Sequence, residues 1–311
     1  MMFADCLSYV AVVSREPEAT VRRLGDLFGL ALAELETDGG RVPAFALGRS
    51  SIIVVPPGHP LSCGRQRPGV DHIAIGVSDL TAAAAEAESR GIRRAGGELP
   101  GIDGARTILL SSKDLVGVRI VLTRPLALPP VALSPISGID HVGVASADVF
   151  GVIAVFRDRL GLPLESTQTD VESALAVETF TSDRYGVVHH SRPARITGGL
   201  RIAFLTIGDC ELEFLQNLDS GHSAEVDASR AGTTKQDQGA IARYIARHGP
   251  GLHHIALRTD DIDALLARAD ALGVPLIDRC GRPGSRRALI GFFSPEAFGG
   301  VLFHLVQRTE L

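Results

Sequence analysis

The chain has 311 residues, which is long enough for two domains with large buried cores. Hydrophobic residues make up 45% of the chain and charged residues 22%, the net charge is −5, and no basic stripe with interleaved aromatic residues argues for nucleic acid as a partner. Four scattered cysteines without a CxxC pair predict reduced thiols in the cytoplasm, and no apolar stretch is long enough to span a membrane.

The first predicted element is a strand over the apolar run Leu7–Val13, which lacks the basic leader and the cleavage site of a signal peptide. An amphipathic helix follows at Pro17–Phe28 and ends at Gly29. The same order recurs three more times: a β-branched strand, a Ser/Asp/Thr turn suited to capping a helix, the helix, a glycine and two or three strands. The later helices are predicted at Leu80–Arg90, Val149–Leu160 and Ile262–Leu272.

The opening strands show the repeat most clearly. Residues 69–79, 138–148 and 251–261 share a pattern in which a histidine precedes alternating small and β-branched residues. Residues 6–12 form a degenerate copy with Tyr9 at the histidine point. Because a repeated sequence unit indicates a repeated supersecondary unit, the chain predicts an α+β fold of four βαβββ modules.

The clearest boundary is the stretch 124–137, whose four prolines exclude both a helix and a central strand. It predicts a domain over 1–124, a linker over 125–137 and a second domain over 138–311, with two modules each. The third module is longer than the others, with extra residues around 170–197 and 217–236. The second insert is rich in Ser, Asp, Gly and Thr and is predicted to be a mobile loop, followed by a helix at Gln238–His248.

Comparison of the modules predicts a metal site in the second half alone. One residue position in each opening strand and one in each closing strand can be aligned across all four modules. The matching residues are His141, Glu213, His254 and His304 in the second half and Tyr9, Ile53, His72 and Val121 in the first half. Burying one carboxylate and three imidazoles costs several kcal/mol unless they are paired. One divalent cation (Zn, Fe, Co, Ni or Mn) is the simplest partner for this set.

Each of these histidines by itself is more typical of a hydrogen-bonded core or surface residue. Four ligand-competent side chains at equivalent points of the modules favour the metal site instead. His253 precedes the predicted ligand His254 and is expected on the opposite face of the strand, outside the ligand set.

These motifs resemble those of the vicinal oxygen chelate superfamily, which includes glyoxalases, bleomycin resistance proteins and dioxygenases. The motifs are GIDHV at 138–142, FRDRLGL at 156–162, RIAFL at 201–205, ELEFL at 211–215, GLHHIA at 251–256 and GVL at 300–302. The resemblance covers nearly all of 138–308 and is strongest to methylmalonyl-CoA epimerase-like and glyoxalase-like members, while the first half matches only in module pattern.

The resemblance implies that modules pair into two domains, each a curved mixed sheet with helices outside. It implies a degenerate, metal-free first domain with a structural or oligomerisation role, and a catalytic second domain that binds the metal. A small-molecule substrate and a homodimer are typical of the family. A metal-free first half followed by a metal-binding second half also resembles the arrangement of 4-hydroxyphenylpyruvate dioxygenase.

Two departures from the family pattern bear on the reaction. Related epimerases, glyoxalases and dioxygenases usually have Glu where this chain has His304, and Glu213 adds a ligand that the dioxygenases generally lack. Four ligands in octahedral geometry leave two adjacent positions for a bidentate substrate. The resemblance therefore favours a metal-dependent epimerase or isomerase that moves a proton alpha to a metal-bound carbonyl, on an acyl-CoA or a cyclic sugar or polyol ketone.

A reaction of this kind needs a base within hydrogen-bond reach of the substrate. The resemblance to methylmalonyl-CoA epimerases implies a carboxylate base on the strand before the Glu213 strand. An ungapped match places Ile202 at that position, so this base is expected to be absent. The remaining candidates are Glu213 itself and three polar residues of the first insert, which are Glu178, Tyr185 and His190.

Two alternatives stay open. One is an Fe(II) dioxygenase of the 4-hydroxyphenylpyruvate dioxygenase or extradiol type, which would consume oxygen with its substrate. The other is a non-catalytic protein that sequesters a small molecule, which would bind tightly without exchanging a proton.

Overall fold

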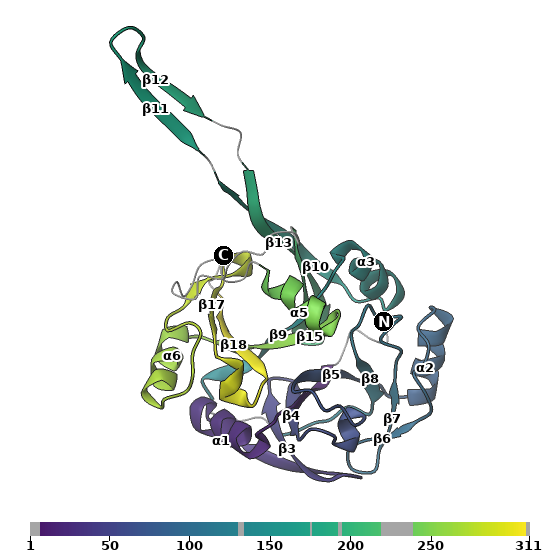
Figure 1. The fold of residues 1–311 in the computed structure, drawn as a ribbon. Helices are drawn as coiled ribbons and strands as arrows, with labels where there is room; N and C mark the ends of the chain where they lie inside the picture. Colours follow the sequence, from purple (N-terminus) through teal and green to yellow (C-terminus); the bar gives the residue numbers. More distant parts are fainter. Residues whose placement is uncertain (1–6, 130–133, 175, 192–194, 219–238, 309–311) are drawn as a thin grey trace.

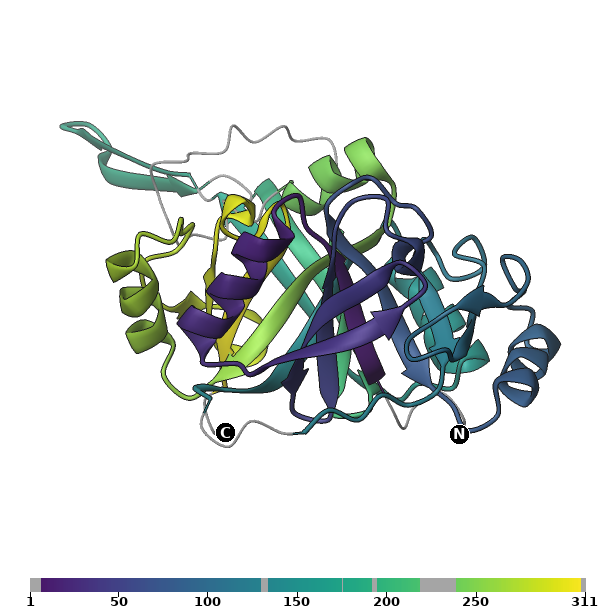
Figure 2. The same cartoon turned by 90° about the horizontal axis from the view of Figure 1, so that it is seen from below.

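A computed structural model describes residues 7–129, 134–174, 176–191, 195–218 and 239–308. Most of these residues belong to two curved, mixed sheets of eight strands each, in the orders β2-β3-β4-β1-β5-β8-β7-β6 and β10-β13-β14-β9-β15-β18-β17-β16. Helices α1, α2, α3 and α6 lie at the outside of the sheets (Figures 1 and 2). The predicted α+β fold of four βαβββ modules is confirmed.

Each sheet is built from one half of the chain. The strands of the first sheet are β1 (Leu7–Val13), β2 (Leu32–Thr37), β3 (Gly40–Leu47), β4 (Ser50–Val55), β5 (Gly69–Gly76), β6 (Leu99–Pro100), β7 (Arg106–Leu109) and β8 (Ile120–Thr123). Those of the second sheet are β9 (Ile136–Ala145), β10 (Leu164–Ala174), β13 (Arg195–Ile207), β14 (Cys210–Asn217), β15 (Gly251–Thr259), β16 (Arg282–Pro283), β17 (Leu289–Phe292) and β18 (Leu302–Gln307).

Four helices begin where the sequence predicts, and the helix predicted at Gln238–His248 begins at Ala240 in the described part of the chain. They are α1 (Pro17–Phe28), α2 (Leu80–Ser89), α3 (Val149–Ile153), α5 (Ala240–His248) and α6 (Ile262–Ala271), with short 3₁₀ turns η1 (Pro60–Ser62), η3 (Ser285–Arg287) and η4 (Pro295–Phe298). The expected caps are present, since the side chains of Asp79, Asp148 and Asp261 accept hydrogen bonds from backbone N–H groups in the first turns of α2, α3 and α6. The third predicted helix continues beyond α3 as a π-helical segment, η2 (Ala154–Arg159).

The centre of each sheet has the same arrangement. Strand β1 is antiparallel to β5 and parallel to β4, and β9 is antiparallel to β15 and parallel to β14. Strand β15 is in turn parallel to β18. The strands β14, β9, β15 and β18 therefore lie side by side, and these are the strands that carry the four predicted metal ligands.

One hydrophobic core joins the two halves. Its buried side chains come from both sheets and from the helices outside them. The ring of Phe28, at the end of α1, lies 5.7 Å from that of Phe293 and 6.2 Å from that of Phe298. Backbone contacts cross the same boundary, for example from the N–H of Arg15 to the carbonyl of Gly299 at 2.9 Å. The division into two domains with bounds at 124 and 138 stays a prediction.

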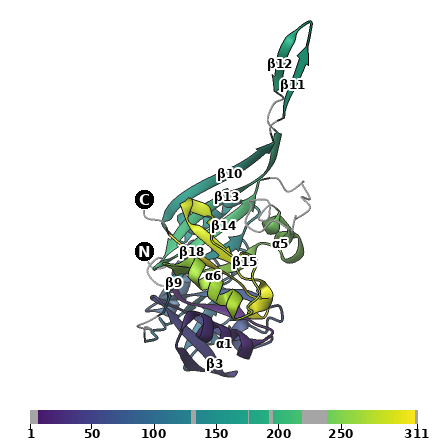
Figure 3. The ribbon, with the colours of Figure 1, turned by 90° about the vertical axis from the view of Figure 1, so that its left-hand side faces the viewer.

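The third module contains two inserts, and the structure describes most of the first but only residues 217 and 218 of the second. The first insert lengthens β10 and β13 and forms a two-stranded hairpin, β11 (Val177–Ser182) and β12 (Gly186–Ser191), which projects from the body of the molecule (Figures 1 and 3). The predicted mobile loop at 217–236 lies outside the described residues from position 219 onward. Among the described helices, none combines the length and the apolar composition that crossing a membrane requires.

The shared core gives a test of how the halves depend on each other. Replacing the fully buried Phe28 by Ala removes a ring that contacts Phe293 and Phe298 of the second half, and we expect a loss of about 3–5 kcal/mol in the free energy of unfolding. Denaturant unfolding measures this loss. As a control, Phe150→Ala, at a ring that is 64% exposed, should cost about 1 kcal/mol or less. Equal effects of the two substitutions would contradict the shared core.

Candidate metal centre

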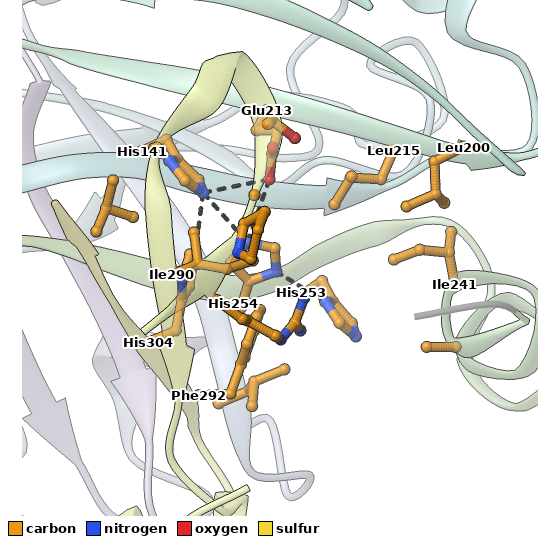
Figure 4. A pocket seen from close by; sticks show the side chains of 18 of the residues that line it. His141, Leu200, Glu213, Leu215, Ile241, His253, His254, Ile290, Phe292 and His304 are labelled. Carbon is orange, nitrogen blue, oxygen red and sulfur yellow. Dashed lines mark hydrogen bonds and ion pairs between the residues drawn. The ribbon is translucent and has the colours of Figure 1, made fainter. Parts of the chain in front are cut away.

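The predicted ligands meet because their strands are neighbours in register. Glu213 of β14 and His254 of β15 are both paired with Gly143 of β9, one from each side. Likewise, His141 of β9 and His304 of β18 are both paired with Ala256 of β15. Side chains of one strand alternate between its two faces, so these four residues project to the same face. Figure 4 shows the three imidazoles and the carboxylate pointing toward one another.

The donor atoms are close enough to share one cation. The Nε2 atom of His141 lies 3.2 Å from Nε2 of His304 and 3.4 Å from Nε2 of His254. The Oε2 atom of Glu213 lies 3.2 Å from Nε2 of His141 and 3.4 Å from Nε2 of His254. A cation with bonds of about 2.1 Å places its neighbouring donors roughly 3.0–3.4 Å apart. The spacing of the three imidazole nitrogens therefore fits a transition metal ion, and the Glu213 carboxylate lies beside two of them.

All four side chains are buried, which makes their charges interdependent. Burial opposes the charge of Glu213, but His141 and His254 hold the pKa of this carboxyl well below its usual range. Burial also opposes a charge on His141, yet Glu213 and Asp140 raise its pKa to about 9. Burial, with His254 and His141 adding to it, holds the pKa of His304 well below its ordinary value, so that imidazole stays neutral. The Glu213 carboxylate pairs with His141 and His254, whereas a cation would accept lone pairs from the carboxylate and the imidazoles together.

Each imidazole is oriented by a different neighbour. The Nδ1 atom of His141 lies 2.8 Å from a carboxylate oxygen of Asp140, a side chain that also accepts hydrogen bonds from Arg258 and Arg308. Such a carboxylate fixes the ring and leaves Nε2 free to bind a metal. The ring of His304 is stacked on Phe292, with centroids 4.3 Å apart and planes at 10°. Its Nδ1 atom is buried and has no hydrogen-bond partner among the described residues.

His253 is placed differently from the sequence prediction. The register of β15 and β9 passes from Leu252 opposite Val144 directly to His254 opposite Gly143, so His253 is the extra residue of a β-bulge. The bulge turns His253 toward the same cavity as His254, not to the opposite face of the strand. Burial and the neighbouring His254 lower the pKa of His253 to about 3, which keeps this ring neutral.

The centre opens into a cavity of about 710 Å³, within the range of small-molecule sites. Most of its wall is apolar, from residues of the second sheet and of α5. The apolar lining includes Leu200, Leu215, Ile241, Ile290, Phe292 and Val306, and the polar lining includes Gln168, Asp170, His253, Arg282 and Ser285. Few polar groups in an apolar wall are typical of a site that orients one part of a small ligand.

Three of the sequence-based candidates lie elsewhere and must be corrected. Glu178, Tyr185 and His190 are exposed on the β11–β12 hairpin, and none of them lines the cavity. The two hairpin strands pair with each other and not with either eight-stranded sheet, and the hairpin projects away from both sheets (Figure 3). Of the four proposed catalytic residues, the structure brings only Glu213 to the centre.

The cavity also contains a carboxylate that sequence reasoning missed. Asp170 and Gln168 line the cavity from the pocket face of β10, and the Gln168 amide nitrogen lies 2.9 Å from both Asp170 oxygens. The register places Gln168 opposite the buried Ile202. Alternate residues of β10 face the same way, so strand periodicity is the signal for Asp170, which lies at the start of the insert predicted around 170–197.

In the first sheet, the positions equivalent to three of the four proposed ligands have a tyrosine or an aliphatic side chain. Tyr9 and Ile53 belong to a buried apolar cluster, and Val121 is buried as well. His72 contacts Tyr9 and pairs with the buried Asp71 at 2.7 Å, which repeats the pairing of His141 with Asp140. Within the described part of the chain, His141, His254 and His304 form the group of three metal-competent residues whose ligand atoms lie within 4.8 Å of one another.

Comparisons with known proteins agree with this architecture. Residues 140–292 match the family model of the Glyoxalase/Bleomycin resistance protein/Dioxygenase superfamily. A curated relative, the uncharacterized protein YqjC of Bacillus subtilis, is 22% identical over 169 residues, which are 54% of this chain and 91% of that protein.

Solved structures are similar to one half or to both. Methylmalonyl-CoA epimerase from Mycobacterium tuberculosis is 26% identical and matches 58% of this chain and 94% of its own, with a TM-score of 0.40. A variant of 4-hydroxymandelate synthase from Streptomyces coelicolor is 16% identical and matches 99% of this chain and 94% of its own, with a TM-score of 0.62. The second likeness shows that the fold extends over both halves.

Gly143 offers a test of the ligand geometry. A Cβ atom at this position would lie 2.0 Å from Cε1 and 2.3 Å from Nε2 of His254, so Gly143→Ala must displace that ring. We expect the affinity for Co²⁺ to drop at least about tenfold, as for other changes that disturb ligand orientation, while the fold is kept. Titration of the metal-free protein with Co²⁺ measures this. Gly138→Ala on the same strand, where the nearest atom is 3.7 Å away, is the control, and equal affinities in both variants would contradict the assignment.

Proposed function

Because the second half of the chain belongs to the glyoxalase/bleomycin resistance/dioxygenase superfamily, we propose that this protein is a metal-dependent epimerase or isomerase. The proposed reaction moves a proton on the carbon next to a carbonyl of a small-molecule substrate. The observation that supports it most directly is the buried set of His141, Glu213, His254 and His304 at the wall of an otherwise largely apolar cavity.

The donor set suits this chemistry. A divalent cation held by three imidazoles and one carboxylate would supply Lewis acidity, which lowers the barrier to removing a proton next to a carbonyl that it binds. Of the groups proposed as ligands, only Glu213 is an anion, so the ligands offset about one of the two positive charges of such an ion. The largely apolar wall lowers the local dielectric constant and thereby strengthens each electrostatic interaction in the cavity.

Asp170 is the proposed base. It is the second carboxylate of the cavity, and Gln168 holds it through contacts from the amide nitrogen to both oxygens at 2.9 Å. Gln168 is held in turn, because its amide oxygen accepts a hydrogen bond from the backbone N–H of Arg286 at 2.9 Å. A carboxylate fixed in this way can accept the proton from one face of the substrate carbon. Inversion also needs a group that supplies a proton to the other face, and Glu213 is the candidate for this role and the alternative base.

The substrate class follows from the cavity. Its volume and apolar wall suit a molecule with a substantial apolar or cyclic body and a carbonyl at the metal end. The two classes that we propose are a cyclic sugar or polyol ketone, enclosed by the cavity, and an acyl-CoA, of which only the acyl end would enter. Assembly as a homodimer is part of the proposal on family grounds alone.

Metal binding can be tested without a substrate. Metal at about 100 times its dissociation constant stabilises a folded protein by about 2.7 kcal/mol, so adding Co²⁺ or Zn²⁺ to metal-free protein should raise its melting temperature. Chelation should reverse this rise. His254→Ala and His304→Ala should lose most of the effect, whereas His190→Ala on the hairpin should keep it. Stoichiometric metal in both ligand variants, measured by elemental analysis, would contradict the site.

Proton transfer is tested by exchange with solvent. Metal-loaded protein is incubated in D₂O with α-hydroxyketones and with acyl-CoA thioesters, and loss of the C–H signal next to the carbonyl is followed by NMR. Asp170→Asn should slow exchange by roughly 10²–10⁴-fold without loss of metal, as expected for a general base. Glu178→Gln on the hairpin should leave the rate unchanged.

The same experiment separates the alternatives. Oxygen uptake stoichiometric with substrate consumption would replace the epimerase by a dioxygenase. Tight binding of a candidate compound without any exchange would favour a sequestering protein.

A further inference from the structure

The outer nitrogen of the proposed ligand His254 is bound by another histidine. Its Nδ1 atom lies 2.9 Å from Nδ1 of His253, whereas the Nδ1 atom of His141 faces a carboxylate. A histidine that offers Nε2 to a metal has its proton on Nδ1, so the Nδ1 atom of His253 must accept that proton's hydrogen bond. The orientation of His254 therefore depends on where the His253 ring is held.

The ring of His253 is held by Tyr244 of α5. The two rings meet edge to face, with centroids 4.6 Å apart and planes at 90°. The Tyr244 hydroxyl donates a hydrogen bond to the carbonyl of Leu252 at 2.6 Å, which fixes α5 to the residue before His253. Tyr244 thus sets both the ring of His253 and the backbone from which it projects.

Tyr244 is held from the first half of the chain. Arg67, in the loop before β5, donates from Nη2 to the Tyr244 hydroxyl at 3.2 Å, and its guanidinium lies 5.5 Å from the centre of the tyrosine ring. The carbonyl of Arg67 accepts a hydrogen bond from Arg65, which pairs with the buried Asp71. Asp71 also binds His72, a pairing of the same kind as that of Asp140 with His141.

A second contact from the first half reaches the start of the same strand. Gly117 has a positive φ of 90°, and a Cβ atom there would collide with the carbonyl of Pro250. A Cβ atom on Gly251, the first residue of β15, would lie 2.9 Å from the carbonyl of Gly117. The two backbones are therefore packed directly on each other, two residues before His253.

We propose that the metal-free first half positions the metal centre, through a line of contacts from Arg67 to Tyr244, to His253 and to the ligand His254. Arg67, Tyr244 and His253 are positioning residues in this proposal, which rests on the proposed function because it takes His254 as a ligand. It gives the first half a role in the site beyond filling the shared core.

The test compares metal binding and stability in matched variants of the full chain. Arg67→Ala removes the first link, Tyr244→Phe removes the hydroxyl that contacts Arg67 and the Leu252 carbonyl but keeps the ring, and His253→Ala removes the contact with His254. The control is Arg268→Ala, which also breaks a hydrogen bond between the halves, from Arg268 to the carbonyl of Asp26 at 2.6 Å, but away from the site. The dissociation constant for Co²⁺, the visible spectrum of the bound Co²⁺ and the urea unfolding midpoint are measured for each.

We expect His253→Ala to weaken Co²⁺ binding roughly 10–100-fold and Arg67→Ala and Tyr244→Phe to weaken it at least about threefold, each with a changed Co²⁺ spectrum. Arg268→Ala should lower the unfolding midpoint without changing the dissociation constant or the spectrum. If Arg67→Ala does not fold, Arg67→Lys takes its place, because lysine preserves most of the packing. Tyr244→Phe then remains as the second test of the same contact.

The outcomes separate this proposal from the proposed function. Arg67 and Tyr244 variants that bind Co²⁺ as the Arg268 variant does would overturn the line of contacts, while metal binding and proton exchange by the wild type would still support the epimerase. A folded wild type that binds no Co²⁺ would overturn both.

Discussion

The burial of one carboxylate among three imidazoles is the constraint on which the rest of this structure depends. Water is excluded from all four side chains, and the charge of each is set by the other three. A protein that needed only a packed core would place apolar side chains there, as the first sheet does with Ile53 and Val121. The surrounding structure keeps the polar set in place: Asp140 orients one ring, the absence of a side chain at Gly143 makes room for another, and Phe292 covers the third.

The two sheets separate the requirements of the fold from those of the site. Both place a buried Asp–His pair next to the central antiparallel pair of strands, at Asp71–His72 and at Asp140–His141. The residue that corresponds to Gly143 is Ala11, which in the first sheet lies opposite His72. A Cβ atom is thus compatible with the strand pairing, and only the imidazole of His254, folded over the strand, requires glycine at position 143. The glycine belongs to the site and not to the fold.

Much of this could be predicted from the sequence, because the information was local or repeated. Helix ends follow from capping Asp residues, and the four convergent side chains follow from strand periodicity together with the comparison of modules. The remainder depends on long-range structure. The bulge at His253 adds one residue to one strand and leaves no mark on composition, and the hairpin that removes Glu178 and His190 from the site has no counterpart in the other modules. Asp170 was missed because the end of β10 could not be told from the start of the insert.

The family resemblance of the sequence predicts a carboxylate at the position of His304, and the surroundings of His304 give a physical reason why imidazole suits this position. The rings of His304 and Phe292 are nearly parallel, at 10° and 4.3 Å, and their contact closes one side of the cavity. The face of an aromatic ring is negative, so a carboxylate at this point would be repelled by Phe292, whereas a neutral imidazole stacks on it. Phe292 is in addition covered by the guanidinium of Arg282, 5.4 Å from the ring centre. His304 and Arg282 both contact the ring of Phe292, so a change of His304 to Glu would also alter the packing of Phe292.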